Sequence, residues 1–405
     1  MVLSARITMV DIQHNQVQPV QLDARKKRRA IVDILRAEIV AGVYPPGSRL
    51  PAQTALVARF RVSGETIQYV MTTLADEGFV EARRRSGTFV SMRPPHLNHY
   101  GIIFPLPNPT MAARSRFYET LHQEVLRRQG APYQFSLYYY NFFEPFETVT
   151  PSPYHERLLA DLAAQRLAGL ILASSPEAFA HTPIITQPDI PRVALASLPN
   201  SLGIPMIKFD IDDFFRKAFV TMTAHGRRKA AIFSIHLDRH MADQHTLLAL
   251  AAQHGIEVRD YWRHGFSNDT RPQATAVTQL LMHLPDADRP DTLIIADDNL
   301  IDPIIAGLNA ARVRVPEELQ LIVLSNYPAP PPPSLSVQML YFDCRAMLAT
   351  ALESLLHQRE ALAGNAPPVP AITALPAFSL EELTAISAVG VDKLIDRNQD
   401  STYIA

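Results

Sequence analysis

Residues 50–90 constrain the fold more than any other stretch, because two short helical patterns are followed there directly by a tight hairpin pattern. The first helix is expected over residues 51–60, since a proline at the start of a helix loses no hydrogen bond. Residues 61–62 are expected to turn the chain, and Ser63 is a favourable N-cap for a second helix. The stretch therefore predicts two helices joined by a two-residue turn.

The second helix of this stretch is amphipathic. Its apolar residues recur at the spacing of one helix face and are Ile67, Val70, Met71 and Leu74. The residues left facing outward are Gly64, Glu65, Gln68 and Thr72. Gly78 is expected to end the helix, so a short helix with one polar face is predicted.

A hairpin follows, with β-prone runs at residues 79–82 and 88–90 around the tip Arg83-Arg84-Arg85-Ser86-Gly87. Gly87 can adopt the positive φ that a tight turn needs. A polar helix face beside a basic hairpin suits the DNA major groove and its flanking phosphates. Residues 50–90 therefore predict a winged helix-turn-helix. The residues expected to contact DNA are Arg49, Thr54, Ser63, Gly64, Glu65, Thr66, Gln68, Arg83, Arg84, Arg85 and Gly87.

Several signatures of this region occur in a familiar order. A helix with Ile31, Ile34, Leu35 and Ile39 inward precedes LVARFRVSGETI, LADEGFV and SGTFV. Over about residues 24–92 the chain resembles the DNA-binding domain of the GntR family of bacterial transcription regulators. Three arginines usual in that family are absent, because the chain has Ala52-Gln53-Thr54, Gly64 and Gln68 at those positions. The usual operator half-site is therefore not expected, and the wing arginines are expected to carry more of the binding.

Composition bounds the class of protein. The chain has 405 residues, 47% of them hydrophobic, which suffices for a small domain and a large one with sizeable cores. Cys344 is the single cysteine, so neither a disulfide framework nor a cysteine metal site is expected, as suits a reducing cytoplasm. No apolar run approaches about 18 residues, and the N-terminus lacks a signal-peptide pattern. A cytoplasmic protein is predicted.

Charge is divided unevenly along the chain. Residues 22–93 hold 13 Lys and Arg against 7 Asp and Glu, a net charge of +6, whereas the whole chain carries −2. The remainder is therefore acidic, and the N-terminal region is the part suited to a polyanion. The basic run at residues 25–29 is either a solvated helix start or a set of phosphate contacts.

Residues 1–22 are expected to form a flexible arm, residues 23–92 the winged domain and residues 93–97 a stiff, proline-containing linker. Residues 98–382 then alternate strand and helix patterns, and residues 383–405 form a poorly patterned tail. Strands are expected at residues 100–105, 133–140, 169–173, 192–196, 206–209, 230–235, 257–262, 292–296 and 320–324. Helices are expected at residues 113–129, 153–167, 212–225, 240–254, 271–283, 299–312 and 343–362. This α/β alternation predicts two lobes built on parallel sheets, with a ligand at the carboxyl ends of the strands.

Four segments of the second domain narrow the choice of fold family: GLILASS, HGRRKAAIF, DTLIIADDNLI and VRVPEELQLIVLSN. In these segments the domain is similar to the effector domain of LacI/GalR regulators, a relative of the periplasmic sugar-binding proteins. The resemblance implies an effector site between the lobes. It places candidate contacts at Asn108, Tyr139, Ser174, Asp243, Asp298 and Asn326. Asp243 stands where that family has a sugar-binding Arg, which argues against an anionic sugar and leaves a sugar or polyol.

Each of these residues also has a plainer interpretation. Asp297 and Asp298 precede a helix, where an Asp is a good N-cap. The aromatic cluster Tyr138, Tyr139, Tyr140, Phe142 and Phe143 can be packing, with one ring stacked on a ligand as the sharper alternative. Trp262, on a predicted strand, is expected to lie in the hydrophobic core and not in a ligand pocket. The prolines of residues 328–333 are expected to form a rigid crossover between the lobes.

Catalysis has no candidate centre in the sequence. The spacing of His236 and His240 is the nearest approach to a metal motif, and no phosphate-binding loop or nucleophile elbow occurs, so no metal or cofactor is expected. The prediction is a dimeric regulator, a repressor released by its effector. One alternative is an enzyme fused to the reader domain, aminotransferase-like. It needs a Schiff-base lysine, and the large domain offers only Lys208, Lys217, Lys229 and Lys393, none in a fitting sequence context. The other is a free sugar-binding protein.

Overall fold

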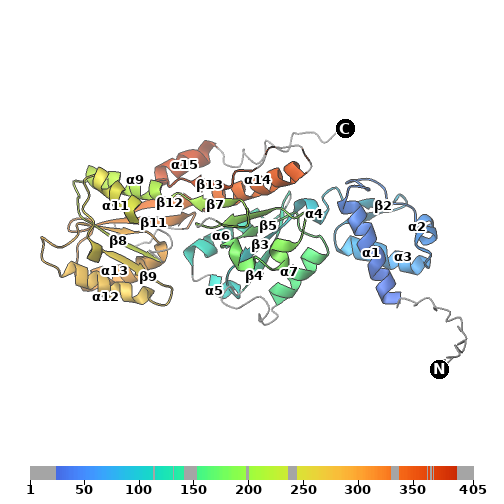
Figure 1. Cartoon of the computed structure of the whole chain (residues 1–405), viewed down its shortest axis with the longest axis horizontal. Coiled ribbons are helices and arrows are strands. Elements are labelled where there is room, and N and C mark those ends of the chain that lie inside the picture. Colours follow the sequence, from blue (N-terminus) through green and yellow to red (C-terminus); the bar gives the residue numbers. More distant parts are fainter. Residues whose placement is uncertain are drawn as a thin grey trace, which may run out of the picture. The chain divides into compact units, whose positions relative to one another are not determined.

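The computed structural model describes residues 24–112, 115–130, 132–140, 153–197, 200–235, 244–329, 337–362, 364, 367 and 369–389. The chain divides into two compact units, residues 1–94 and 95–405 (Figure 1). Each unit has its own buried core. The mixed α/β fold class with an N-terminal winged helix-turn-helix is confirmed.

The first unit is a three-helix module with a hairpin. Its elements are α1 (Ala24–Val40), α2 (Gln53–Phe60), α3 (Gly64–Asp76), β1 (Val80–Arg83) and β2 (Gly87–Val90). The two strands pair antiparallel, with Val80 opposite Val90 and Arg83 opposite Gly87. Ile67, Val70 and Leu74 of α3 are buried as the stripe predicts.

Two details of this unit differ from the prediction. Ile34 was expected to face inward, but its side chain is 43% exposed, and Val32 is buried beside Leu35 instead. Ile31, Leu35 and Ile39 are buried as predicted, so the buried face of α1 extends toward Val32 and not toward Ile34. Helix α2 begins at Gln53 rather than Pro51, with Ala52 as its N-cap.

The second unit contains two parallel sheets, each at the centre of a lobe (Figure 1). Lobe 1 is built on a six-stranded sheet in the order β13-β7-β6-β5-β3-β4, and lobe 2 on a five-stranded sheet in the order β12-β11-β10-β8-β9. The lobe 1 strands are β3 (His99–Phe104), β4 (Gln134–Tyr139), β5 (Gly169–Leu172), β6 (Arg192–Leu195), β7 (Met206–Phe209) and β13 (Ile372–Leu375). The lobe 2 strands are β8 (Ala230–Ile235), β9 (Arg263–Phe266), β10 (Thr292–Ile295), β11 (Gln320–Tyr327) and β12 (Gln338–Asp343).

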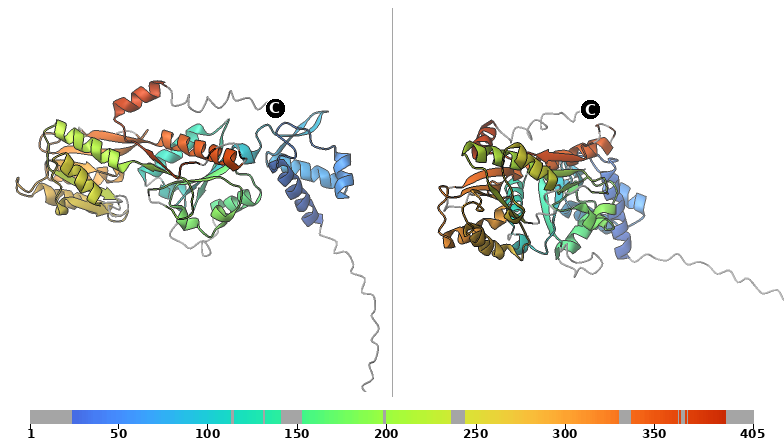
Figure 2. Two further views of the ribbon diagram at one scale, coloured as in Figure 1. Left: turned by 45° about the horizontal axis from the view of Figure 1, so that its top comes forward. Right: turned by 60° about the vertical axis from the view of Figure 1, so that its left-hand side comes forward.

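Helices cover both faces of each sheet, as Figures 1 and 2 show for lobe 2. The main helices are α6 (Arg116–Arg128), α7 (Pro153–Ala163), α9 (Ile211–Ala224), α11 (Gln244–Gln253), α12 (Ala274–Met282), α13 (Ile301–Ala310), α14 (Cys344–Leu362) and α15 (Leu380–Val389). Successive strand residues enter opposite cores: Ile294 packs with α9 and α11, whereas Leu293 and Ile295 pack with α12 and α13. Burial on both faces explains why these strands are continuous apolar runs.

The chain passes between the lobes three times. It crosses from β7 into α9, from β12 into α14 and from β13 into α15, because each of these strands and the helix after it belong to cores of different lobes. Phe209, at the end of β7, and Phe342, near the end of β12, stack with ring centroids 4.2 Å apart. Two of the crossings are therefore packed against each other.

Several predictions for this unit are wrong. The strand expected at residues 257–262 lies at Arg263–Phe266, and Trp262 ends a short 3-10 turn, although it is fully buried as expected. The proline segment 328–333, partly outside the described residues, does not connect the lobes, because β11 before it and β12 after it are neighbours in one sheet. Strands β12 and β13 were not predicted. The expected start of the tail at residue 383 falls inside α15, whose Leu383 is buried.

Candidate functional site

The turn between α2 and α3 is built from local hydrogen bonds. Arg61 adopts the left-handed conformation at φ 51°, which ends α2. Ser63 caps α3 by accepting a hydrogen bond from the Thr66 N–H at 3.3 Å. The Gln53 amide donates to the Gly64 carbonyl at 2.8 Å and so links the first turns of the two helices. The predicted cap is confirmed, and the Ser63 hydroxyl is occupied by it.

The outer face of α3 is polar and exposed. Glu65, Gln68 and Thr72 are exposed as the sequence predicts, and Gly64 is half-buried against Gln53. Tyr69 lies on the exposed side as well, with half of its surface accessible. Tyr69 is not among the residues predicted to contact DNA, although its position directly after Gln68 and outside the apolar stripe could have identified it.

The three arginines of the wing, residues 80–90, have different surroundings. The Arg83 guanidinium lies 4.4 Å from the Phe89 ring centroid and 3.3 Å from the Glu81 carboxylate. Arg84 and Arg85 are exposed in the turn, where Arg85 has φ 62°. The two tip arginines are therefore placed to reach a partner, whereas Arg83 first interacts within the hairpin.

Gly87 leaves room for Arg49. A Cβ atom on Gly87 would lie 2.9 Å from the Arg49 Nε, and the φ of Gly87 is 107°, a conformation that other residues rarely adopt. Arg49 is exposed and bridged to Phe89 of the wing by backbone pairing. Thr54, in the first turn of α2, is also exposed. The predicted DNA-contacting residues thus come from α2, α3, the wing and the strand-like segment before α2.

The carboxyl edges of the two lobe sheets face each other. Arg116 begins α6, which follows β3 of lobe 1, and Asn299 follows β10 of lobe 2. The Arg116 backbone N–H donates to the Asn299 Oδ1 at 2.9 Å, and the Arg116 guanidinium lies 3.2 Å from the Asp302 carboxylate. The loops after the strands of one sheet therefore contact those of the other, as the predicted ligand position between the lobes requires.

Asp298 is held by Asn326, another predicted effector contact. Its side chain is 1% exposed and accepts hydrogen bonds from the Asn326 backbone N–H at 3.2 Å and from the Asn326 amide at 3.0 Å. Burial, followed by the charge of Asp297, raises the pKa of Asp298 to about 7. Asp297, not Asp298, is the N-cap, because it accepts from the Asn299 N–H at 2.9 Å. The cap interpretation therefore applies to Asp297 alone.

Tyr139, at the end of β4, is packed into lobe 1. Its ring stacks on Phe104 at 5.4 Å between centroids and meets Tyr154 edge-on at 4.9 Å. Its hydroxyl lies 3.4 Å from the His122 Nδ1, and burial raises its pKa to about 12. These contacts favour the packing interpretation of the aromatic cluster, whose Phe142 and Phe143 lie outside the described residues.

Ser174, after β5, carries a buried hydroxyl oxygen with no hydrogen-bond partner among the described residues. Such an atom normally finds a partner in the protein, in water or in a ligand. Asn108, in the loop after β3, is half-buried. Asp243 lies outside the described residues, as do His236 and His240. The structure thus brings Asp298 and Asn326 into contact and places Asn108, Tyr139 and Ser174 after strands of lobe 1.

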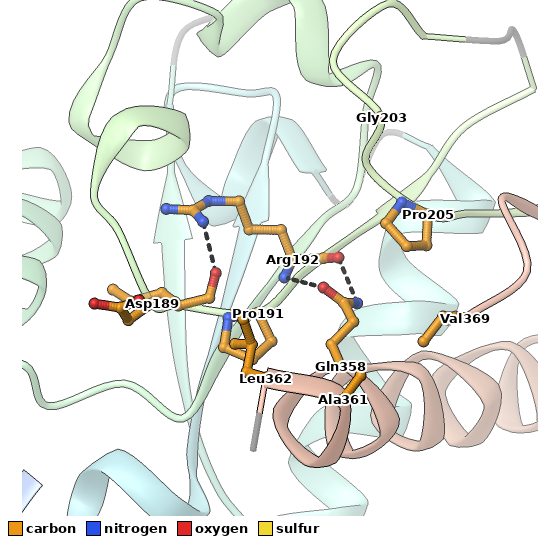
Figure 3. Close-up of a pocket in the computed structure, with 10 residues that line it drawn as sticks. Asp189, Pro191, Arg192, Gly203, Pro205, Gln358, Ala361, Leu362 and Val369 are labelled. Carbon is orange, nitrogen blue, oxygen red and sulfur yellow. Dashed lines mark hydrogen bonds between the residues drawn. The ribbon is translucent and has the colours of Figure 1, made fainter. Parts of the chain in front are cut away.

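A cavity of about 460 Å³ lies elsewhere, at the amino ends of β6, β7 and β13 (Figure 3). The Arg192 guanidinium donates there to the carbonyls of Ile184 and Ile190, both at 2.6 Å, and burial lowers its pKa to about 10. The Gln358 side chain donates to the Arg192 carbonyl at 2.8 Å and accepts from the Arg192 backbone N–H at 3.1 Å. Because the cavity is at the opposite edge of the sheet from the carboxyl ends of the strands, it is not the predicted effector site.

The next observations concern a metal site, a membrane span and the lysines of the large unit. In the part of the chain that the structure describes, no group of three or more His, Cys, Asp or Glu side chains could hold a metal ion. Among the same residues no helix has the length and apolar character needed to cross a membrane. Lys217 contacts Asp213 at 3.3 Å, and Lys229 donates to the Ala287 carbonyl at 2.9 Å, so both lysines have structural contacts.

Comparison with known proteins agrees with both units. Residues 27–90 match the model of bacterial regulatory proteins of the gntR family, and residues 221–380 match that of a periplasmic binding protein-like domain. The chain is 33% identical over 98 residues to the mannosyl-D-glycerate transport/metabolism system repressor MngR of Escherichia coli K12, covering 24% of this chain and 39% of that repressor. It is 34% identical over 74 residues to the HTH-type transcriptional regulator Rv1152 of Mycobacterium tuberculosis H37Rv, covering 17% and 61%. The chain thus spans less than two thirds of either relative.

A solved structure has the same fold as the large unit. It is a transcriptional regulator LacI from Bacillus cereus subsp. cytotoxis NVH 391-98, which is 14% identical, with a TM-score of 0.50 over 70% of this chain and 97% of its own. Both resemblances stated from the sequence are confirmed at the level of fold. The chain therefore joins a helix-turn-helix domain that matches the gntR family model to a two-lobed domain that matches the periplasmic binding protein-like model.

Proposed function

We propose that the protein is a cytoplasmic, homodimeric transcription repressor that binds operator DNA through its first unit and a small polyhydroxy ligand through its second. The observation that carries this proposal is the union in one chain of a gntR-type domain with two parallel-sheet lobes whose carboxyl edges meet at Arg116 and Asn299. One unit suits a polyanion, and the other suits a ligand that two surfaces can enclose.

DNA binding rests on the exposed face of α3 and on the wing. Glu65 and Gln68 can meet base edges in the major groove, and Arg84 and Arg85 can meet phosphates. A two-fold dimer reads a two-fold site, so the operator is a near-palindrome. With Gly64 and Gln68 in place of the usual arginines, the wing contributes a large part of the phosphate contacts.

Effector binding rests on the lobe edges. The Asp298 carboxylate can accept hydrogen bonds from ligand hydroxyls, and the Asn326 amide can donate to a neighbouring hydroxyl. The Ser174 hydroxyl has no partner within the described part of the chain. A sugar or polyol offers hydroxyls that suit all three. Such a ligand bridges the lobes, and it shifts their arrangement only if it binds one arrangement better than the other. We propose that the favoured arrangement releases the operator.

Two measurements on the full chain test this function. Selection from a pool of random duplexes should recover a near-palindromic site, and light scattering should show a dimer. A thermal-shift screen against sugars and polyols should find a ligand that stabilises the large unit, by about 2.7 kcal/mol at 100 times its Kd. If no duplex is enriched and no ligand stabilises the chain, the proposed function is wrong. A monomer that binds DNA with full affinity would overturn the dimer.

A further inference from the structure

The recognition helix α3 has no basic side chain. Its sequence GETIQYVMTTLAD holds two acidic residues and neither Lys nor Arg. A helix that enters a groove of DNA lies between two rows of phosphates, and cations on or beside it supply much of the affinity. A neighbouring element must therefore provide positive charge next to this face.

Helix α1 brings Arg28 to that position. The Arg28 guanidinium carbon lies 5.1 Å from the centroid of the Tyr69 ring, on the exposed side of α3. One residue earlier, the Lys27 Nζ lies 3.4 Å from the Arg61 carbonyl oxygen in the turn between α2 and α3. The basic start of α1 therefore lies along the same surface as the recognition helix.

Arg28 differs from Arg36 and Arg59, two other arginines of this unit, in its partners. Arg36, two turns further along α1, lies 2.7 Å from both Asp33 and Glu77, and Arg59 is paired with Glu38. Arg28 has no ion pair among the described residues, and its Nε is buried without a hydrogen-bond partner. The aromatic ring thus holds a guanidinium whose charge is not compensated by any carboxylate of the described residues. A guanidinium retains donors for a phosphate when one face is stacked.

We propose that Arg28, held in place by Tyr69, binds a backbone phosphate of the DNA beside the groove that α3 enters, and so supplies the positive charge that α3 lacks. Arg28 is the contacting residue, and Tyr69 is a positioning residue. The inference rests on the proposed DNA-binding function. It also decides between the two interpretations of the basic run at residues 25–29, in favour of phosphate contact at Arg28.

The experiment measures binding of the full chain to its selected duplex across a series of salt concentrations. Arg28→Ala should weaken binding about fivefold at 0.15 M salt and reduce the salt slope by about 0.9, as expected for one lost phosphate contact. Arg28→Lys should keep most of the slope, because the charge remains. Arg216→Ala, which removes an exposed arginine from α9 of the other unit, is the control for net charge and should change neither quantity.

Tyr69 is tested by a double-mutant cycle. Tyr69→Phe keeps the ring and should bind like the unchanged chain, whereas Tyr69→Ala should weaken binding about threefold in the chain with Arg28 and not in the Arg28→Ala background. A salt slope unchanged by Arg28→Ala, while Arg84→Ala lowers it, would overturn the inference and leave the proposed function standing. Equal losses from Tyr69→Ala in both backgrounds would overturn the positioning role. If the unchanged chain enriches no duplex, both the inference and the proposed function fail.

Discussion

The exposed face of α3 and the carboxyl edge of the lobe 2 sheet satisfy their polar groups in opposite ways. On α3, Glu65, Gln68 and half of Tyr69 are open to solvent. After β10, Asp298 is 1% exposed, and near the end of β11, Asn326 is 4% exposed; each is the hydrogen-bond partner of the other. The polar side chains of α3 are therefore accessible to a partner, whereas those of Asp298 and Asn326 are already paired with each other.

This difference predicts different responses to binding. A partner of α3 displaces only water, so the DNA-reading face needs no rearrangement within the unit. A ligand that uses Asp298 must replace its bonds with Asn326, and leaving either group unpaired in the interior costs about 1 to 3 kcal/mol. Ligand binding at this edge is therefore coupled to a local rearrangement, which is the property a switch requires.

The largest effect is expected from Asp298→Asn. A carboxylate that accepts hydrogen bonds from ligand hydroxyls contributes about 1.5 to 3 kcal/mol, so effector binding should weaken roughly 10- to 150-fold. Binding of the selected duplex without effector should be unchanged, since Asp298 belongs to the other unit. Calorimetry with a ligand found by thermal shift measures the first quantity. Effector binding and release equal to those of the unchanged chain would mean that Asp298 serves only to hold Asn326.

The next effect concerns the wing. Changing Arg83, Arg84 and Arg85 together to Ala should weaken duplex binding roughly 30-fold at 0.15 M salt and lower the salt slope by about two, for two lost phosphate contacts. Arg83→Ala alone should contribute least, because Arg83 pairs with Glu81 and stacks on Phe89. Fluorescence anisotropy across a salt series measures both. An unchanged slope in the triple variant would show that the wing does not touch phosphate.

The pH dependence should be smaller and specific to Asp298. Its pKa of about 7 exceeds the value of about 3.9 for an unfolded Asp, so the folded chain holds the proton longer. This contribution to stability is present below pH 4 and is lost as the pH rises to 7. Effector affinity should rise as the pH approaches 7, because the ionised carboxylate is the better acceptor. Titrations of Asp298→Asn should lack both trends; identical profiles would contradict the assignment.

The smallest effect is expected at the contact between the lobes. Asn299→Ala removes the acceptor for the Arg116 N–H, a hydrogen bond worth about 0.5 to 1.5 kcal/mol. Effector binding should weaken about two- to tenfold, and small-angle scattering of the ligand-free chain should show a larger radius. Asp302→Ala is the matched control, because its pair with Arg116 is exposed and such pairs contribute little. If both variants had equal effects, the hydrogen bond between Arg116 and Asn299 would not be what holds the two lobes together.

Local patterns predicted much of the fold. The stripe on α3 and the cap at Ser63 were read correctly because both depend on residues within one or two turns. The apolar run of β8 predicts the correct strand bounds because both faces of this strand are buried. The prediction for Ile34 is wrong because the burial of α1 depends on how α3 packs against it, which the spacing within α1 does not contain.

The site was less predictable because its contacts are distant in sequence. The pairing of Asp298 with Asn326 joins two strand ends 28 residues apart, and the contact of Arg28 with Tyr69 joins two helices. Strand β13 was missed because residues 372–375 are half-exposed at a sheet edge and lack the apolar signal of the central strands.

A ligand in the large unit is expected to control DNA binding by the small one. The direct test is the affinity of the full chain for its selected duplex, measured by anisotropy with and without a saturating ligand from the thermal-shift screen. We expect weaker binding with ligand in the unchanged chain and no change with Asp298→Asn at the same ligand concentration. A ligand that stabilises the large unit and leaves the duplex affinity of the unchanged chain unaltered would rule out this control.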